Sequence, residues 1–254
     1  MRNVLIIWRK EMGSYFVSPI AYLLLTMFAL IFGYFFWVQL SLFVRFAMES
    51  QMRGQAFPMN LNEELIRPLL SNASVIGLFF IPMITMRLFA EEKRTGTIEL
   101  LATSPIRDGE IIIGKWLAAV TLYATMLLFT ALSFAFLFKY GNPDWKPLAI
   151  GYLGLLLQAG GLLAIGTFIS TLTKNQIIAG AATFGICLLL WVFSWLENDG
   201  SRWAAVLSYM SVITHFESFA KGVLDTKDAI FYLTVIFVGL FFTARSMESL
   251  RWRS

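Results

Sequence analysis

Charged residues are scarce in this chain of 254 residues, and cysteine and histidine occur only once each. Charged residues make up 14% of the chain and apolar residues 58%, whereas soluble domains average about 25% and about 45–50%. A soluble globular protein is therefore excluded. The single cysteine, Cys187, and the single histidine, His215, exclude an intramolecular disulfide and a His/Cys metal cluster. We predict no catalytic residue, no metal site and no cofactor.

Six long apolar runs account for the composition. A helix needs about 20 residues to cross a hydrocarbon core of about 30 Å, because each residue rises about 1.5 Å. Backbone polar groups have no water at that depth, so each run is predicted to be a helix. The expected spans are 19–44, 69–90, 111–138, 148–171, 176–196 and 229–245. The predicted fold is an all-α integral membrane protein, with residues 1–254 as a single transmembrane domain.

Local signals refine the first two spans. Ser18 followed by Pro19 predicts a helix N-cap and the first residue of a helix. The apolar run that follows is too long for a cleaved signal peptide, so we expect it to be retained as a span. Pro82 lies inside the second run and predicts a kink there.

Two further apolar segments are not expected to cross the membrane, because one is apolar on one face only and the other is too short. Segment 2–16 places its apolar side chains near one helical face and its basic ones elsewhere, which predicts an amphipathic helix at the membrane interface. A simple membrane anchor is the alternative role for it. Segment 203–219 is apolar but too short to span, so we expect an interfacial or re-entrant helix pair on the outer side, between spans five and six.

The net charge of +4 is interpreted first as topology, because Lys and Arg are retained on the cytoplasmic side. No basic stripe with interleaved aromatic residues is present, which argues against nucleic-acid binding. With the N-terminus inside, 12 of the 20 basic residues fall on the cytoplasmic side. They are Arg2, Arg9, Lys10, Arg87, Lys93, Arg94, Arg107, Lys115, Lys174, Arg245, Arg251 and Arg253. Both termini are therefore predicted to be cytoplasmic.

The connection 91–110 is the longest predicted cytoplasmic segment and is mostly polar. Gly96 is expected to break a helix that continues from the second span. Thr97 then caps a short helix that carries Ile98 and Leu101 on one face and Glu99 elsewhere. Such a helix suits a partner protein as a lever; a solvated loop that only returns the chain to the membrane is the alternative.

The same connection resembles the characteristic segment of ABC-2 type transporter permeases. The resemblance lies in the run Glu91-Glu92-Lys93-Arg94-Thr95-Gly96-Thr97-Ile98-Glu99-Leu100-Leu101, then Thr103-Ser104-Pro105 and Gly114-Lys115. The N-terminal helix, the six spans and the outer segment before the last span are also similar to that family. Within it, Ser18-Pro19-Ile20-Ala21-Tyr22 and Met86-Arg87-Leu88-Phe89-Ala90-Glu91-Glu92 look most like the permeases of gliding-motility transporters and of copper-site maturation.

The resemblance implies a permease subunit of an ABC exporter in a bacterial inner membrane, with membrane lipid around it. It implies pairing with a second six-span permease, as a homodimer or heterodimer, and with cytoplasmic ATPase subunits. ATP hydrolysis would then belong to the partner, and this chain would not be an enzyme. The helix 96–103 would be the coupling helix, assisted by helix 2–16. The implied ATPase-coupling residues are Glu91, Glu92, Gly96, Thr97, Ile98, Glu99 and Leu101.

The run 109–116 tests whether the chain binds ATP itself. Its glycines and Lys115 have phosphate-loop spacing, but Trp116 stands where a Ser or Thr should meet magnesium. A phosphate loop also follows a strand, whereas this run leads into a span, so its backbone N–H groups are committed within a helix. We therefore predict the start of the third span here, and an energy source in another chain.

Polar residues inside the spans are few. Gln158 lies in the fourth span beside Gly160 and Gly161, and glutamine forms hydrogen bonds where small residues let helices approach. Gln158 and Gly161 are therefore candidates for helix packing or for a translocation path, and both interpretations stay open. No ionisable residue lies near the middle of a span, which argues against an ion-coupled carrier. A membrane scaffold that transmits force without moving a solute stays open as the alternative function.

Overall fold

The computed structural model describes residues 2–53, 60–98, 106–198 and 201–251, and these residues form helices without a strand. Six helical stretches are long and apolar enough to cross a membrane, which confirms the predicted all-α fold with six spans. They contain α2 (Pro19–Met52), α3 (Arg67–Thr85) with α4 (Ala90–Thr95), α6 (Asp108–Tyr140), α7 (Trp145–Leu172), α8 (Gln176–Val192) and α11 (Thr226–Arg251). The second span begins at Asn62, before α3, and the fifth continues past α8 to Leu196.

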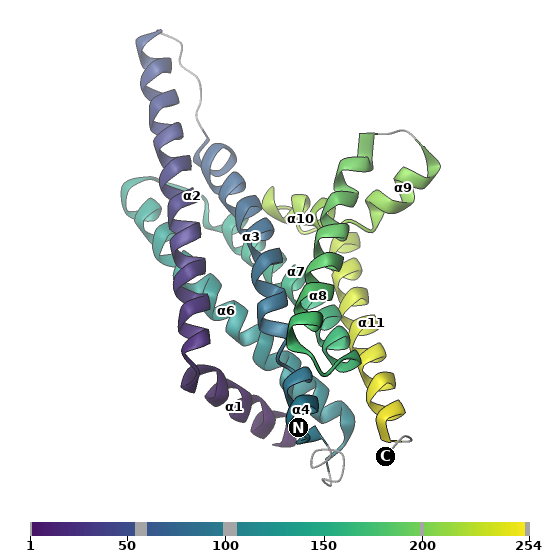
Figure 1. Ribbon diagram of the computed structural model, residues 1–254. Helices are drawn as coiled ribbons and strands as arrows, with labels where there is room; N and C mark the ends of the chain where they lie inside the picture. The colour runs from purple at the N-terminus through teal and green to yellow at the C-terminus, as the bar shows by residue number, and fades with distance from the viewer. Residues whose placement is uncertain (1, 54–59, 99–105, 199–200, 252–254) are drawn as a thin grey trace.

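The remaining elements are short. Helix α1 (Arg2–Val17) precedes the first span, and α9 (Arg202–Tyr209) and α10 (Val212–Ala220) stand between the last two. A π-helical turn at Asn62–Ile66 leads into α3, and a 3-10 turn at Phe193–Asn198 ends α8. Helix α1, α4 and the last described turn of α11 lie at one end of the bundle, called here the α4 end (Figure 1). Helices α9 and α10 lie toward the other, called the outer end.

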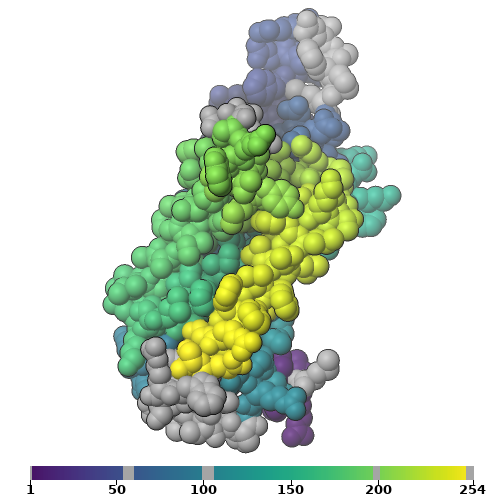
Figure 2. All heavy atoms as spheres, turned by 90° about the vertical axis from the view of Figure 1, so that its right-hand side faces the viewer, coloured from purple at the N-terminus to yellow at the C-terminus, as the bar shows by residue number. Residues whose placement is uncertain are grey.

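Helices α3 and α7 form the centre of the bundle. The most apolar stretch of the span containing α3 is 72% buried, whereas that of α11 is 22% buried. Helices α8 and α11 cover one side of the molecule (Figure 2). Glycines let α7 come close to its neighbours: a Cβ added at Gly166 would lie 2.5 Å from Thr85 Oγ1 of α3, and one at Gly154 would lie 2.5 Å from Phe219 Cβ of α10.

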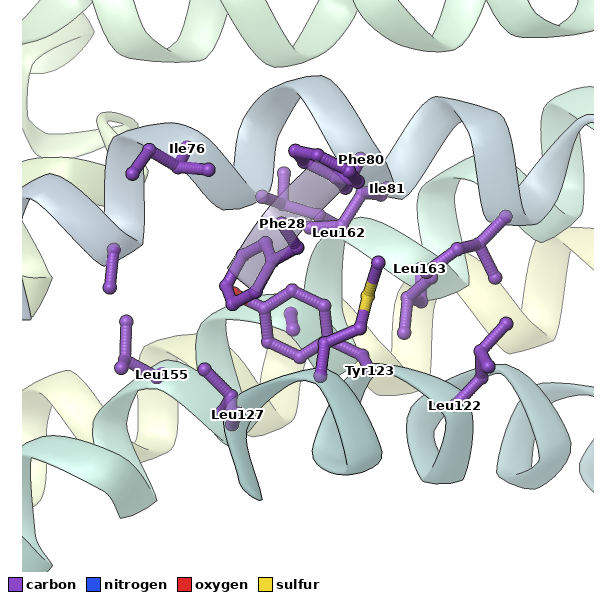
Figure 3. Packing of buried hydrophobic residues seen from close by; sticks show 14 of the residues in the cluster. Phe28, Ile76, Phe80, Ile81, Leu122, Tyr123, Leu127, Leu155, Leu162 and Leu163 are labelled. Carbon is purple, nitrogen blue, oxygen red and sulfur yellow. The ribbon is translucent and has the colours of Figure 1, made fainter. Parts of the chain in front are cut away.

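Aromatic side chains fill the core between α2, α3 and α6. The Phe28 ring meets the Phe80 ring edge to face, with 5.3 Å between their centroids, and its centroid lies 6.2 Å from that of Tyr123. Figure 3 shows the three residues among their neighbours. All three side chains are at most 4% exposed. Edge-to-face pairs of this kind add to the free energy gained from burial. They join the first span to the second and third at mid-bundle.

The first span begins as the Ser18-Pro19 pair predicted. Helix α2 starts at Pro19, and the Ser18 hydroxyl accepts a hydrogen bond from the N–H of Ile20 at 3.4 Å. The helix is longer than expected, with 34 residues. At about 1.5 Å per residue it measures about 50 Å, more than the apolar core of a bilayer. Its outer part therefore projects beyond the other helices (Figure 1).

The second span differs from the expectation of one helix over 69–90. Pro82 lies within α3, and the helix continues to Thr85 before an irregular turn over 86–89. The break thus comes one turn after the proline. Thr85 contributes to it, because its hydroxyl bonds back to the carbonyl of Ile81 at 3.1 Å, and such bonds bend helices.

The outer segment forms the expected pair of short helices, α9 and α10, whose depth in the membrane stays a prediction. His215 of α10 lies buried against the start of α11. It is 5% exposed, its Nδ1 lies 2.7 Å from Asp228 Oδ1, and its Nε2 lies 2.8 Å from the carbonyl oxygen of Tyr209. Its ring stacks on Phe231 at 3.8 Å. His215 therefore fastens α10 to the first turn of α11.

Candidate coupling site

The turn between α3 and α4 is held by a side chain of another helix. The N–H groups of Phe89 and Ala90 have left the α3 hydrogen-bond pattern, and both donate to the Ser170 hydroxyl of α7 at 3.1 Å. Ser170 is fully buried. Unbonded N–H groups at this position would cost free energy. Ser170 thus stabilises the break and fixes the start of α4 against α7.

Lys115 of α6 holds the same turn from a second direction. Its Nζ donates to the carbonyl oxygen of Leu88 at 2.9 Å and lies 3.0 Å from Glu11 and 2.8 Å from Glu92. It also lies over the Phe89 ring at 5.2 Å. The residue is 2% exposed, and a buried ammonium requires such partners. One cation therefore links α1, the α3–α4 turn, α4 and α6; we call Lys115, Glu11 and Glu92 the Lys115 cluster.

Helix α1 is fixed along the first turns of α6. Asn3 donates to Glu110 at 2.9 Å, and the Trp8 indole donates to the Thr121 hydroxyl at 3.0 Å. Between these contacts the helices are close, since a Cβ added at Gly114 would lie 2.9 Å from Ile7. The side of α1 that faces α6 is thus partly polar, and its position at a membrane interface stays a prediction.

Gly96 ends α4, as expected for a glycine that breaks the continuing helix. Its φ of 75° lies in the left-handed region, which other residues rarely adopt. Thr97 after it is exposed, and Ile98 is half-buried against the hydrophobic core. Glu99 and Leu101, and with them most of the predicted helix 96–103, lie outside the described residues.

A polar cavity of about 470 Å³ opens beside α4. Its lining mixes acids and bases: Lys10, Glu11, Ser14, Arg87, Glu91, Glu92, Thr95, Thr97 and Lys115. Glu92 is committed to Lys115, whereas no described residue forms an ion pair or hydrogen bond with the side chain of Glu91. Both glutamates line the cavity, but Glu92 is paired with Lys115 and stabilises the junction, whereas Glu91 has no ion-pair or hydrogen-bond partner among the described residues.

The comparisons with known proteins agree with this architecture. The model of the ABC-2 family transporter proteins matches residues 4–236. This chain belongs to the ABC-2 transporter family. It is also 27% identical over 172 residues to the probable multidrug ABC transporter permease YbhR of Escherichia coli K12, and equally to that of Escherichia coli O157:H7. The match covers 65% of this chain and 44% of each relative, so the chain aligns with less than half of their length.

The phosphate-loop-like run of this ABC-2 protein lies in a helix, as predicted. Residues 109–116 form the first turns of α6. Gly114 faces Ile7 of α1, and the Lys115 ammonium is surrounded by the carboxylates and carbonyl described above. The run therefore serves helix packing and an internal ion pair.

Gln158 and Gly161 lie at helix contacts of α7. Gln158 is 3% exposed and accepts a hydrogen bond from the Ser74 hydroxyl of α3 at 2.7 Å. A Cβ added at Gly161 would lie 3.1 Å from Val235 of α11. These contacts agree with the packing interpretation, and a role of either residue in translocation stays a prediction.

Sequence reasoning missed Glu11 and Ser170 and did not foresee the partners of Lys115. Glu11 and Lys115 did offer a signal, because Glu11 is the one acidic residue of α1 and Lys115 follows an apolar stretch of α6. Their pairing joins residues 104 positions apart, which one sequence does not indicate. Ser170 gave no signal, since a serine in a membrane helix is commonly bonded to its own backbone.

Proposed function

We propose that this chain is the permease subunit of an ABC exporter and that segment 91–110 couples it to a separate cytoplasmic ATPase subunit. The observation that carries the proposal is the buried junction at α4. A force applied to the chain after Gly96 reaches α7 through Ser170 and reaches α1 and α6 through Lys115. A solvated loop would not need such a junction.

Within the coupling segment the residues have different tasks. Glu92 holds α4 through Lys115, while Gly96 sets the direction in which the chain leaves α4. Glu91 and Thr97 line the cavity beside α4, where a partner side chain has access. We assign ATPase coupling to the set predicted from the sequence: Glu91, Glu92, Gly96, Thr97, Ile98, Glu99 and Leu101.

The assembly that we propose contains a second six-span permease, identical to this chain or different from it. Helices α2, α8 and α11 expose most of their apolar stretches, which leaves surface for lipid and for that subunit. We place the complex in a bacterial inner membrane with the α4 end, and so both termini, in the cytoplasm. The Escherichia coli relatives are probable multidrug permeases, which supports multidrug export, and therefore lipophilic substrates, over a force-transmitting scaffold.

Gly96 offers a test of coupling. The chain, its ATPase and any second permease are reconstituted in liposomes, and ATP-driven export of a lipophilic cationic dye is measured. Gly96→Val is expected to lose most of the export, because a β-branched residue opposes the left-handed conformation by more than about 1 kcal/mol. Gly96→Asn is the matched control, since asparagine tolerates that conformation, and it should retain most of the export.

The outcomes separate the candidate functions. Wild-type export by Gly96→Val would contradict coupling through the end of α4. ATP hydrolysis by the complex without movement of the dye, or of any compound in a panel of lipophilic and amphiphilic molecules, would favour the scaffold. Dye movement by this chain without any ATPase would favour a carrier.

A further inference from the structure

A second cavity, of about 220 Å³, adjoins the polar cavity beside α4. The two share Glu11, Ser14, Arg87 and Glu91 in their linings. The smaller cavity extends between the end of α1, the first turns of α2 and the end of α3. It therefore begins at the polar junction and continues toward the hydrocarbon region.

The lining of the smaller cavity changes from polar to apolar along this direction. Ser14, Tyr15 and Ser18 stand near the junction with Arg87 and Glu91. The apolar part is formed by Ile20, Ala21 and Leu24 from α2 and by Met83, Ile84 and Leu88 from α3 and the turn after it. A ligand that fits both parts has a polar headgroup and an apolar chain.

Two charges in this cavity have no partner among the described residues. The Arg87 Nε atom is buried without a hydrogen bond, and neither Arg87 nor Glu91 takes part in an ion pair there. Glu11, in contrast, is committed to Lys115 at 3.0 Å. A buried guanidinium nitrogen without an acceptor is costly unless a ligand supplies one. Planar guanidinium groups are well suited to phosphate oxygens.

The Tyr15 hydroxyl adds a neutral donor. Burial raises the pKa of Tyr15, the carboxylates of Glu11 and Glu91 raise it further, and the Arg87 guanidinium opposes them. The hydroxyl therefore stays protonated, and no described residue accepts its hydrogen bond. The free groups are thus one cation and one neutral donor, which suit a phosphate, and one carboxylate, which suits an ammonium.

We propose that this cavity binds an aminophospholipid of the leaflet at the α4 end. Arg87 and Tyr15 hold the phosphate, Glu91 accepts hydrogen bonds from the primary ammonium, and the upper part of an acyl chain lies between α2 and α3. A primary ammonium donates hydrogen bonds to a carboxylate and a quaternary one does not. Phosphatidylethanolamine is therefore favoured over phosphatidylcholine, and over phosphatidylglycerol, which lacks the cation.

Native mass spectrometry of the purified full-length chain in detergent tests the proposal. The protein is titrated with the ethanolamine, choline and glycerol phospholipids that carry the same two acyl chains. The wild-type protein is expected to bind the ethanolamine lipid about ten times more tightly than the other two. No ATPase is present, so a failure here leaves the proposed export function standing.

Three variants make the test specific. Arg87→Gln should weaken all three lipids about tenfold, because each loses its phosphate partner. Glu91→Gln should weaken only the ethanolamine lipid and so abolish the headgroup preference. Met83→Trp, which fills the apolar part, should weaken all three. Arg9→Gln is the matched control, because Arg9 is exposed on α1 and does not line either cavity.

Each variant is compared with the wild-type protein in melting temperature and in gel filtration, so that misfolding is recognised. Equal affinity of the wild-type protein for the three lipids would overturn the proposal. So would unchanged ethanolamine-lipid affinity in a folded Arg87→Gln protein. Retained headgroup preference in Glu91→Gln would overturn the assignment of the ammonium to that carboxylate.

Discussion

The two ends of the bundle use buried polar groups in different ways. At the outer end, both ring nitrogens of His215 have partners, the Asp228 carboxyl and the Tyr209 carbonyl. Neither side chain of the pair is left without a partner. At the α4 end, ion pairs join the Lys115 cluster, although the buried Glu92 Oε2 has no hydrogen-bond partner among the described residues. The cluster stands beside Arg87 and Glu91, which form no ion pair with a described residue.

The difference indicates that the polar groups of the outer end only hold helices together, whereas some of those at the α4 end are available to a ligand or a partner. The outer pair closes a contact between α10 and α11, and nothing in its surroundings calls for a ligand. The α4 end has a rigid centre with free charges at its edge, next to cavities of about 470 and 220 Å³. Substitutions at the outer end should therefore change stability alone. Substitutions at the α4 end should also change coupling or lipid binding.

The largest effect is expected from Lys115→Met. The substitution leaves the carboxylates of Glu11 and Glu92 without their main partner, each only 13% exposed. Removing one member of a buried ion pair costs about 3–5 kcal/mol. We expect a loss of that size in the free energy of unfolding in detergent, and loss of ATP-driven export. Lys10→Met is the matched control: Lys10 lies 3.4 and 3.7 Å from the same carboxylates but is 61% exposed, so about 0–1 kcal/mol is expected.

A triple variant separates the two consequences of that change. Lys115→Met with Glu11→Gln and Glu92→Gln removes the unpaired charges, and replacing a whole buried ionic group by neutral side chains is often tolerated. Stability should recover largely, while export should not, because α4 is no longer fastened to α1 and α6. Full recovery of export would show that the ionic link serves stability alone.

His215→Ala should have the next largest effect. It leaves Asp228 buried without its partner and removes the stack on Phe231, so a loss of about 1–3 kcal/mol is expected. Thr214→Ala is the matched control, because the Thr214 hydroxyl is buried and has no hydrogen-bond partner among the described residues. A complex that contains a folded His215→Ala subunit should hydrolyse ATP and export as the wild-type complex does. A coupling defect at normal stability would contradict the holding role of the outer end.

Gly166→Ala tests the contact between α7 and the end of α3. The added Cβ would lie 2.5–2.7 Å from three atoms of the β-branched Thr85 side chain, which has little freedom to move. Overpacking of this kind costs about 1–3 kcal/mol. Gly185→Ala, with nothing within 4 Å of its added Cβ, should instead be neutral or slightly stabilising. Equal melting temperatures for the two variants would show that α7 and α3 are less closely packed than they are in the structure.

Much of the fold followed from local patterns, and the junction did not. Apolar run length indicated the six spans, Ser18-Pro19 the start of α2, and Gly96 the end of α4, because each depends on a few neighbouring residues. The break after Thr85 came one turn later than Pro82 indicated, since Thr85 and the distant Ser170 also determine it. Lys115 and His215 are charges and polar groups whose partners are chosen by packing, so their roles required the structure.

The smallest effect is expected from Glu91→Gln, which is best compared with the same change at its neighbour Glu92. Glu92→Gln weakens an ion pair with Lys115 at 2.8 Å, and hydrogen bonds to charged groups are worth about 1.5–3 kcal/mol. Glu91→Gln removes a charge without a described partner, so its effect on the free energy of unfolding should stay within about 0.5 kcal/mol. Denaturant unfolding of both variants in the same detergent measures the difference.

The two ends differ most clearly if Glu91→Gln changes the lipid preference without changing stability. Glu92→Gln should then lower stability without changing the lipid preference. Glu92 would then belong to the rigid centre of the α4 end and Glu91 to its ligand-facing edge, although the two are neighbours in sequence. An equally large stability loss in both variants would mean that Glu91 is committed inside the protein. The α4 end would then be as closed as the outer end, and its free charges could not serve a lipid headgroup.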